Sequence, residues 1–298
     1  MKKLIYLLAA SFLVLASCKQ EAKKEESPEP MEETEKRFGG LALYTVRDSM
    51  ASDPRGTLKK VADMGYAYIE AAGYEDGKYY GMEPLVFKAY LDSLGLEGVS
   101  SHQSAITLEN GEQMLKDAKE AGFKYLVVPI PPMGHFWYDN ETQTMGMSGT
   151  VEEVNSILNT LGKQAHEIGI ELLYHNHDFE LRPNEDGVVP MDYFIENTDP
   201  KYVNFQMDLF WAVKAGADPI AYFEKAPGRI KAWHIKDMDT EGKFAPVGQG
   251  TIDFAAILAE KSKAGMEYYF VEQDQTWGLD PLEAIAISRK GLEKHGFE

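Results

Sequence analysis

The chain has 298 residues, of which 48 are acidic and 30 basic, and its formal net charge at pH 7 is −18. A chain this acidic lacks the basic surface that a phosphate backbone requires, which argues against a nucleic-acid partner and against phosphodiesterase chemistry on DNA. The single cysteine cannot form an internal disulfide. Residues 39–298 are enough for one large domain with a substantial core.

The N-terminal segment has the pattern of an export signal. Lys2 and Lys3 precede an apolar run over residues 4–15, which is too short to span a bilayer comfortably. The run ends in Leu-Ala-Ser-Cys, which resembles a bacterial lipobox, in which the cysteine is lipidated and becomes the new N-terminus. We therefore predict a lipoprotein signal peptide at residues 1–17 and lipidation at Cys18. The alternative is a simple cleaved signal peptide with an unused cysteine.

Residues 18–38 are rich in glutamate and lysine, contain two prolines and have almost no apolar side chains. This composition predicts a disordered, solvated tether between the lipid anchor and the folded domain. The protein is then expected to be an exported bacterial lipoprotein, held at a membrane through Cys18 and facing either the periplasm or the cell exterior.

From residue 39 onward, short apolar runs alternate with amphipathic stretches. The strands are expected to begin near Leu41, Ala67, Gly98, Lys124, Ile170, Val203, Ile230 and Tyr268. The clearest helix starts are Asp53-Pro54, a capping box from Thr150 to Glu153, and Asp280-Pro281. Eight strands alternating with helices predict a single (β/α)8 TIM barrel over residues 39–298. A doubly wound open sheet is the alternative, but no glycine-rich phosphate-binding motif follows the first strand.

Four strands in the second half of the chain end in side chains typical of metal ligands. They lie in Leu172–His177, Phe205–Asp208, Ala232–Asp237 and Tyr269–Glu272. Buried His, Asp and Glu need partners, and catalytic groups of TIM barrels lie at the C-terminal ends of the strands. Two imidazoles and two carboxylates suit one divalent transition metal, so the predicted ligands are His175, Asp208, His234 and Glu272. The alternative is that these are structural polar residues of the core.

The alternation of side chains along a strand directs further polar groups to the same mouth. The candidate catalytic residues are Glu70, His102, His177, Lys236 and Glu272. The candidate substrate-binding residues are Arg47, Trp137, Gln206 and Trp211.

The segment after the fourth strand, residues 131–149, is long and contains aromatic side chains without periodicity. A long structureless loop in a compact domain is often a lid, and aromatic faces suit sugar rings. The other interpretation, which the sequence leaves equally open, is that these aromatic side chains pack on the rim of the barrel.

At these strand ends the chain resembles the xylose isomerase-like barrel superfamily, often called sugar phosphate isomerases/epimerases, over residues 39–298. The family binds one divalent metal through a Glu, Asp, His and Glu set from the fifth to eighth strands, and Asp208, His234 and Glu272 match the last three. The fifth strand departs from this pattern, because many relatives carry Glu-Asn-His where this chain has His175-Asn176-His177. His175 is assigned to the metal position, with His177 as the alternative ligand.

The resemblance implies a small carbohydrate substrate, a keto-sugar whose enediolate is stabilised by the metal as a Lewis acid. Mn²⁺ is the favoured ion, and Co²⁺, Zn²⁺, Fe²⁺ and Mg²⁺ are alternatives. Because a metal-bound imidazole is a poor proton shuttle, His175 disfavours symmetric epimerisation. A lyase or dehydratase acting by elimination or hydration on a 3-keto-glycoside or inosose-like substrate is therefore expected. The alternatives are a sugar epimerase or isomerase, and a sugar-binding lipoprotein without catalysis. The sequence leaves the oligomeric state open.

Overall fold

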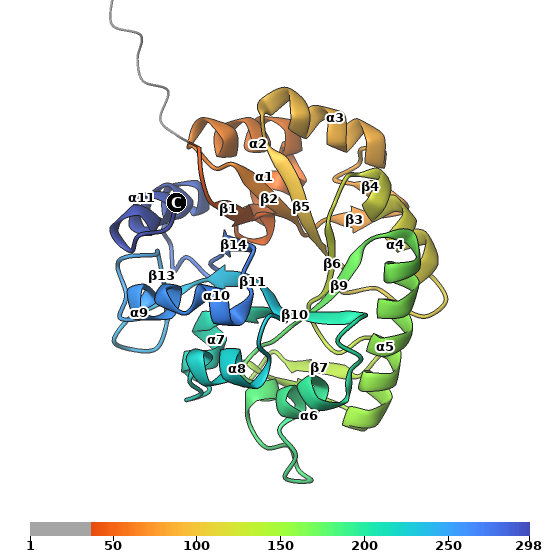
Figure 1. Cartoon of the computed structure of the whole chain (residues 1–298). Helices are drawn as coiled ribbons and strands as arrows, with labels where there is room; N and C mark the ends of the chain where they lie inside the picture. The colour runs from red at the N-terminus through yellow and green to blue at the C-terminus, as the bar shows by residue number, and fades with distance from the viewer. Residues whose placement is uncertain (1–36) are drawn as a thin grey trace, which may run out of the picture. The chain divides into compact units, whose positions relative to one another are not determined.

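The structure is a computed structural model, and it describes residues 37–298 (Figure 1). The predicted signal peptide at residues 1–17, Cys18 and the tether as far as residue 36 lie outside the described residues. Arg37 and Phe38, the last two residues of the predicted tether, contact the domain. The Arg37 guanidinium donates to the carbonyl of Leu94 at 2.6 Å, and Phe38 packs against the core. Within residues 37–298, no helix has the length and apolar character needed to cross a membrane.

Eight parallel strands close into a barrel in which each strand pairs with its neighbours in chain order (Figure 1). They are β1 (Gly40–Ala42), β2 (Tyr68–Ala71), β5 (Glu97–His102), β6 (Tyr125–Val128), β9 (Glu171–His175), β10 (Val203–Asp208), β11 (Ile230–Ile235) and β14 (Tyr268–Val271). Each begins within one residue of its predicted start. The prediction of a (β/α)8 barrel is confirmed, and the doubly wound alternative is wrong.

Helices surround the barrel (Figure 1). They are α1 (Arg47–Ser52), α2 (Pro54–Asp63), α3 (Pro84–Leu94), α4 (Gly111–Glu120), α5 (Val151–Ile168), α6 (Pro190–Asn197), α7 (Leu209–Lys214), α8 (Pro219–Lys225), α9 (Phe254–Ala259), α10 (Lys261–Ala264) and α11 (Pro281–Lys294), with 3₁₀ turns η1 (Leu43–Val46) and η2 (Phe179–Leu181). The predicted caps are present at Asp53, Thr150 and Asp280, whose side chains accept hydrogen bonds from the first turns of α2, α5 and α11.

Alternate strand positions fill the interior of the barrel with apolar side chains. This inner layer consists of Ala42, Val99, Tyr125, Val127, Leu173, Ala232 and Phe270. His175 and His234 stand two residues beyond Leu173 and Ala232 on the same strands, and therefore on the same face. The apolar layer thus lies directly beneath the polar strand ends and excludes water from their base.

The N-terminal end of the barrel carries an ionic network centred on Glu267, which precedes β14. Lys231 lies 3.1 Å from its carboxylate, Lys124 forms a second ion pair with it, and the Tyr125 hydroxyl donates to it at 2.9 Å. Burial acts to raise the pKa of Glu267, but the hydrogen bonds from these three side chains outweigh it and lower the pKa to about 2. The ionised carboxylate therefore stabilises the folded state above the unfolded pKa of 4.5, and this contribution is lost as the pH falls toward 2.

We expect Glu267→Gln to lower the free energy of unfolding by about 1 kcal/mol at pH 7, the upper range for partly exposed ion pairs. The difference from the unsubstituted protein should shrink as the pH falls from 5 toward 3. Urea unfolding at a series of pH values measures it. A difference that stays constant with pH would contradict the assigned role of the ionised carboxylate.

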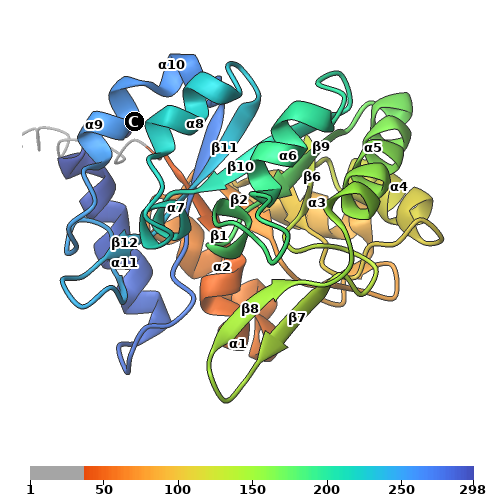
Figure 2. The ribbon, with the colours of Figure 1, turned by 90° about the horizontal axis from the view of Figure 1, so that it is seen from below.

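The segment after β6 differs from its prediction as a structureless loop. It forms an antiparallel hairpin of β7 (Phe136–Asp139) and β8 (Thr144–Met147), which extends away from the barrel (Figure 2). Its aromatic residues favour strands, and a two-residue alternation over only four residues is too short to be recognised in sequence. Two smaller hairpins also follow barrel strands: β3 (Tyr74–Glu75) with β4 (Lys78–Tyr79), and β12 (Asp237–Met238) with β13 (Phe244–Ala245).

Candidate active site and metal centre

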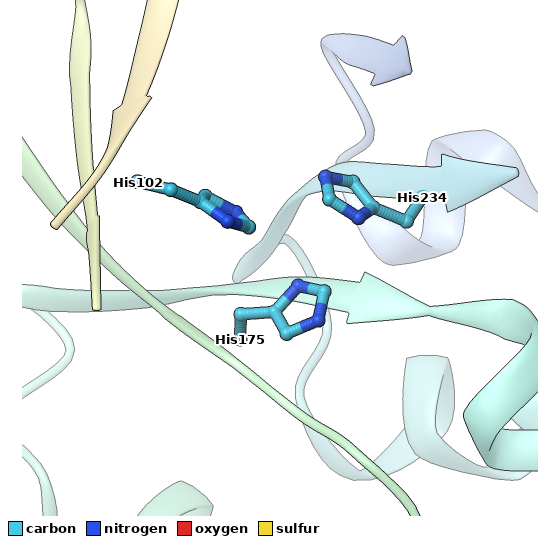
Figure 3. A group of neighbouring side chains, drawn as sticks. All are labelled: His102, His175 and His234. Carbon is cyan, nitrogen blue, oxygen red and sulfur yellow. The ribbon is translucent and has the colours of Figure 1, made fainter. Parts of the chain in front are cut away.

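Carboxylates and imidazoles from six strands meet at the C-terminal rim of the barrel. The predicted residues that converge there are Glu70, His102, His175, Asp208, His234 and Glu272. The rings of His102, His175 and His234 point toward one another (Figure 3), and the His234 ring centroid lies 4.7 Å from that of His175 and 5.1 Å from that of His102. Because parallel strands end at one rim, residues far apart in sequence share this small volume.

Gln206 orients two of these rings. Its side-chain nitrogen donates to Glu70 at 2.6 Å, so its oxygen faces the other way and lies 2.7 Å from His102 Nε2 and 2.9 Å from His175 Nδ1. An amide oxygen only accepts, so both of these ring nitrogens carry the proton. Burial lowers the pKa of His175 well below its ordinary value, so this imidazole is neutral. Its second nitrogen, Nε2, therefore keeps its lone pair, and it lies 3.7 Å from Asp208 Oδ2.

A lone pair facing a carboxylate oxygen in a buried site calls for a cation between them. His175 and Asp208 are both buried, and Asp208 Oδ2 faces the Lys236 ammonium at 2.8 Å without a further hydrogen-bond donor among residues 37–298. One ligand atom from each of Asp208, His234 and Glu272 lies within 4.8 Å of the others. The donor set of imidazole nitrogens and carboxylate oxygens fits a divalent transition metal.

His234 is held by carboxylates on both sides. Glu272 Oε2 lies 2.8 Å from its Nδ1, and Glu70 Oε1 lies 2.7 Å from its Nε2. Burial acts to lower the pKa of His234, but Glu272 and Glu70 outweigh it and raise the pKa to about 10. A metal bound at Nδ1 would displace the proton that this nitrogen carries. The hydrogen bond from Nε2 to Glu70 is of the kind that fixes the orientation of a metal-ligating imidazole.

Lys236 is fully buried and lies among three carboxylates. Its Nζ is 2.8 Å from Asp208 Oδ2, 2.5 Å from Glu272 Oε2 and 3.0 Å from Asp274 Oδ1. Burial acts to lower the pKa of Lys236, but these carboxylates outweigh it and hold the pKa well above its ordinary value. Together with Glu70, the site contains four carboxylates and two cationic groups, the Lys236 ammonium and the His234 imidazolium. An additional cation would balance this excess of negative charge.

The two fifth-strand histidines have different surroundings. His175 belongs to a second group of possible ligands, with His102 and His234, whose ring nitrogens lie within 4.8 Å of one another, whereas His177 belongs to neither group. The His177 ring stacks on Phe179 and lies 5.6 Å from the ring of Trp211. Burial and the nearby Lys236 ammonium lower the pKa of His177 to about 3, so this imidazole is neutral. Its Nδ1 is enclosed and has no hydrogen-bond partner among residues 37–298, which leaves Nε2 as the nitrogen open to the cavity.

Sequence reasoning missed Asp274 and Glu180. Asp274 follows Glu272 by two residues, and this spacing was the available signal, because it repeats the alternation of β14. Glu180 is fully buried and accepts hydrogen bonds from the Tyr174 hydroxyl and from the His177 backbone N–H, both at 2.8 Å. Burial raises the pKa of Glu180 to about 8. No pattern in the sequence singles this residue out.

A cavity of about 720 Å³ opens above the cluster. Its lining includes the predicted residues His102, His175, His177, Trp211, Lys236 and Glu272, and also Tyr44, Phe136, Tyr138, Phe244, Asp274 and Trp277. Of the other predicted substrate-binding residues, Gln206 lies beneath the cavity and positions the rings. Arg47 does not line the cavity, because it donates to the backbone carbonyls of Tyr44 and Asp274. Trp137 points to the opposite side of β7 from Phe136 and Tyr138, and lies against Gly146.

Eight parallel strands with clustered ligand-type side chains at their C-terminal rim define a TIM barrel with its functional site in the usual place. Residues 58–294 match the family described as xylose isomerase-like TIM barrel, and the chain belongs to this family. The resemblance noted in the sequence is thereby confirmed.

Curated relatives and solved structures agree with this assignment. The chain is 29% identical to an inosose dehydratase of Lacticaseibacillus casei, over 74% of this chain and 84% of that enzyme. It is 31% identical to an inosose dehydratase of Clostridium tetani, over only 52% of that enzyme. A sugar phosphate isomerase/epimerase of Parabacteroides distasonis superimposes with a TM-score of 0.71 and 26% identity, covering 88% of this chain and 95% of that one.

The IOLI protein, whose crystal structure holds a zinc atom, superimposes with a TM-score of 0.64 and 17% identity. The superposition covers 87% of this chain and 97% of that one. At this identity the likeness shows the fold alone.

Proposed function

We propose that this protein is a metal-dependent lyase or hydratase that acts on a keto-sugar. The observation that carries the proposal is the convergence of Asp208, His234 and Glu272, with the free Nε2 of His175 beside them, on the floor of a cavity that accommodates a sugar. The similarity to inosose dehydratases supports elimination of a β-substituent from such a substrate.

His175, Asp208, His234 and Glu272 would hold the metal, with Mn²⁺ favoured. When bound, a divalent ion supplies Lewis acidity that stabilises the negative charge developing on the substrate carbonyl oxygen. Glu70 and Gln206 orient the imidazoles from below. Lys236 neutralises the carboxylates that the metal leaves uncompensated.

His177 is the residue best placed to move the proton. It is neutral, it lines the cavity, and Nε2 is the nitrogen open to it. Nε2 accepts the proton from the carbon next to the ketone, and the electron pair moves into the enolate. The enolate then expels the β-oxygen substituent, which takes up the proton from His177 and leaves as an alcohol or water. Glu70 is less suited as the acid, because the hydrogen bonds from His102 and His234 hold its pKa well below the ordinary value against the opposing effect of burial.

A product assay tests this proposal. The Mn²⁺-loaded protein is incubated separately with methyl 3-keto-glucoside, with an inosose and with a ketose, and the products are followed by NMR. We expect an unsaturated ketone, or its hydrate, from the 3-keto-glucoside or the inosose. Clean C3 epimerisation of the ketose alone would refute elimination in favour of an epimerase. Sugar binding without any turnover would indicate a binding lipoprotein.

We further propose that the protein is an exported lipoprotein anchored through Cys18, on the strength of the Leu-Ala-Ser-Cys motif. We expect the full chain, expressed in a bacterial host, to incorporate labelled palmitate and to fractionate with membranes. Cys18→Ser should abolish the labelling, because serine has no thiol to accept the lipid. A palmitate-free protein with an intact Cys18 would contradict the anchor.

A further inference from the structure

The cavity is larger than the proposed reaction requires. Elimination engages one sugar ring above the ionic cluster, whereas the cavity encloses about 720 Å³. This volume is in the range of pockets that bury drug-sized ligands. Its lining extends from the buried Glu272 to the exposed Trp277. The outer part of the cavity therefore has room for a second group of ring size.

Aromatic side chains from opposite sides of the barrel border this outer part. Phe136 and Tyr138 belong to the β7–β8 hairpin, which follows β6, while Trp277 follows β14. Strands β6 and β14 stand four positions apart in the closed eight-stranded ring, and so face each other across it. Because residues from both loops line one cavity, a ligand that fills the mouth contacts both.

Trp277 has a backbone conformation that is unfavourable for a residue with a bulky side chain. Its φ is +52°, in the left-handed region where a bulky side chain costs about 1 kcal/mol. The turn is closed by hydrogen bonds between Thr276 and Leu279, at 2.7 and 3.0 Å. The indole is nevertheless 61% exposed, so burial does not compensate for the strain. A strained, exposed aromatic side chain at the mouth of a cavity is typical of a ligand contact.

Polar side chains between the aromatic ones indicate what kind of ring binds. Gln143, Lys214, Lys243 and Gln275 are exposed and line the same outer part. The Tyr138 hydroxyl donates to Gln143 at 2.7 Å, which holds that amide at the edge of the hairpin. A pyranose presents C–H groups on its face and hydroxyl groups at its edge, and so matches aromatic faces interspersed with polar groups. An aryl group would match only the aromatic faces.

We infer that the outer part of the cavity is a subsite for a second sugar ring, and that the substrate is a glycoside whose leaving group is a sugar. The reaction step of this inference rests on the proposed function. The binding of a second sugar ring rests on the cavity alone. In the elimination, the bond from the sugar carbon to the bridging oxygen breaks, and that oxygen takes the proton from His177. The leaving sugar departs with a free hydroxyl group.

The test compares ligands that share the first ring and differ in the second. Calorimetry measures the binding of methyl β-D-glucoside, cellobiose, maltose and 4-nitrophenyl β-D-glucoside, and steady-state kinetics measure the 3-keto derivatives of the first three. We expect at least one disaccharide to bind ~10-fold more tightly than the methyl glucoside, the gain expected from stacking on one aromatic ring. The same ratio should appear in kcat/KM of the 3-keto compounds.

Two substitutions locate the subsite. Trp277→Asn removes the indole but tolerates the left-handed backbone, and should abolish the preference for the disaccharide without weakening methyl glucoside binding. Phe136→Ala should reduce the same preference. Leu85→Ala, which removes an apolar side chain 59% exposed on α3, is the matched control and should leave both ligands unchanged.

Each outcome decides between the two proposals. Equal affinity for methyl glucoside and both disaccharides would overturn the subsite, even if methyl 3-keto-glucoside is turned over as proposed. An increase in affinity that is seen only with 4-nitrophenyl β-D-glucoside would overturn the assignment of the subsite to a sugar ring. A disaccharide preference that depends on Trp277, seen without turnover of any keto-glycoside, would uphold the subsite and refute the proposed reaction.

Discussion

Glu272→Gln should lose at least ~10³-fold in turnover and most of its bound metal. An amide oxygen is a weaker metal ligand than a carboxylate. The Lewis acidity that the ion supplies lowers the activation free energy of the proposed reaction by several kcal/mol, and each 1.36 kcal/mol corresponds to a tenfold change in rate. Glu272 also lies 2.8 Å from His234 Nδ1 and 2.5 Å from Lys236 Nζ, so its loss disturbs two further groups of the site. Metal analysis and NMR assays of the same preparation measure both effects.

Glu83→Gln is the matched control, because it makes the same chemical change at an exposed carboxylate whose ion-pair partner is Lys78. It should retain metal and turnover. Loss of turnover with full retention of metal in Glu272→Gln would remove this residue from the ligand set and leave it as a proton-transfer group. Unchanged turnover and metal content would refute the metal centre as assigned.

Lys236→Met should lower the free energy of unfolding by about 3–5 kcal/mol in the presence of a chelator. The buried ammonium is the common partner of Asp208, Glu272 and Asp274, and methionine leaves three carboxylates without it. The same ammonium repels a metal held by Asp208 and Glu272. We therefore expect the variant to bind Mn²⁺ more tightly and to recover most of its stability when the ion is added.

Thermal unfolding with chelator and with excess Mn²⁺ measures this effect in both proteins. Lys78→Met removes an exposed lysine and should change stability by no more than about 0.5 kcal/mol under either condition. The prediction fails if Mn²⁺ stabilises the unsubstituted protein and Lys236→Met equally. In that case the three carboxylates and the metal would not share one site.

The strands and the positions of the candidate ligands could be predicted from patterns among residues that are neighbours in the sequence. A buried parallel strand is a short apolar run, and eight of these were visible along the chain. Alternation then placed His175 on the face of Leu173 and His234 on the face of Ala232, which the inner layer of the barrel confirms. Both inferences needed only neighbouring residues.

Short-range rules failed where the chain leaves the barrel. The hairpin after β6 was expected to be a structureless loop, so the sequence did not separate Trp137 from Phe136 and Tyr138. Strand alternation within the hairpin turns Trp137 away from the cavity and the other two toward it. Asp274 was missed for a related reason, because it lies three residues beyond the end of β14, whereas Glu272 directly follows the last residue of that strand.

The sequence by itself determined that this protein is a barrel whose later strands end in imidazoles and carboxylates, because local periodicity sets both secondary structure and the face on which a side chain lies. Only the tertiary structure decided which protons those groups carry and which cations they face. Gln206, for example, places the proton of His175 on Nδ1 through contacts with His175 and Glu70, which lie 31 and 136 positions away in the sequence. Such contacts arise only when the barrel closes, since closure brings strand ends from the whole chain into one volume.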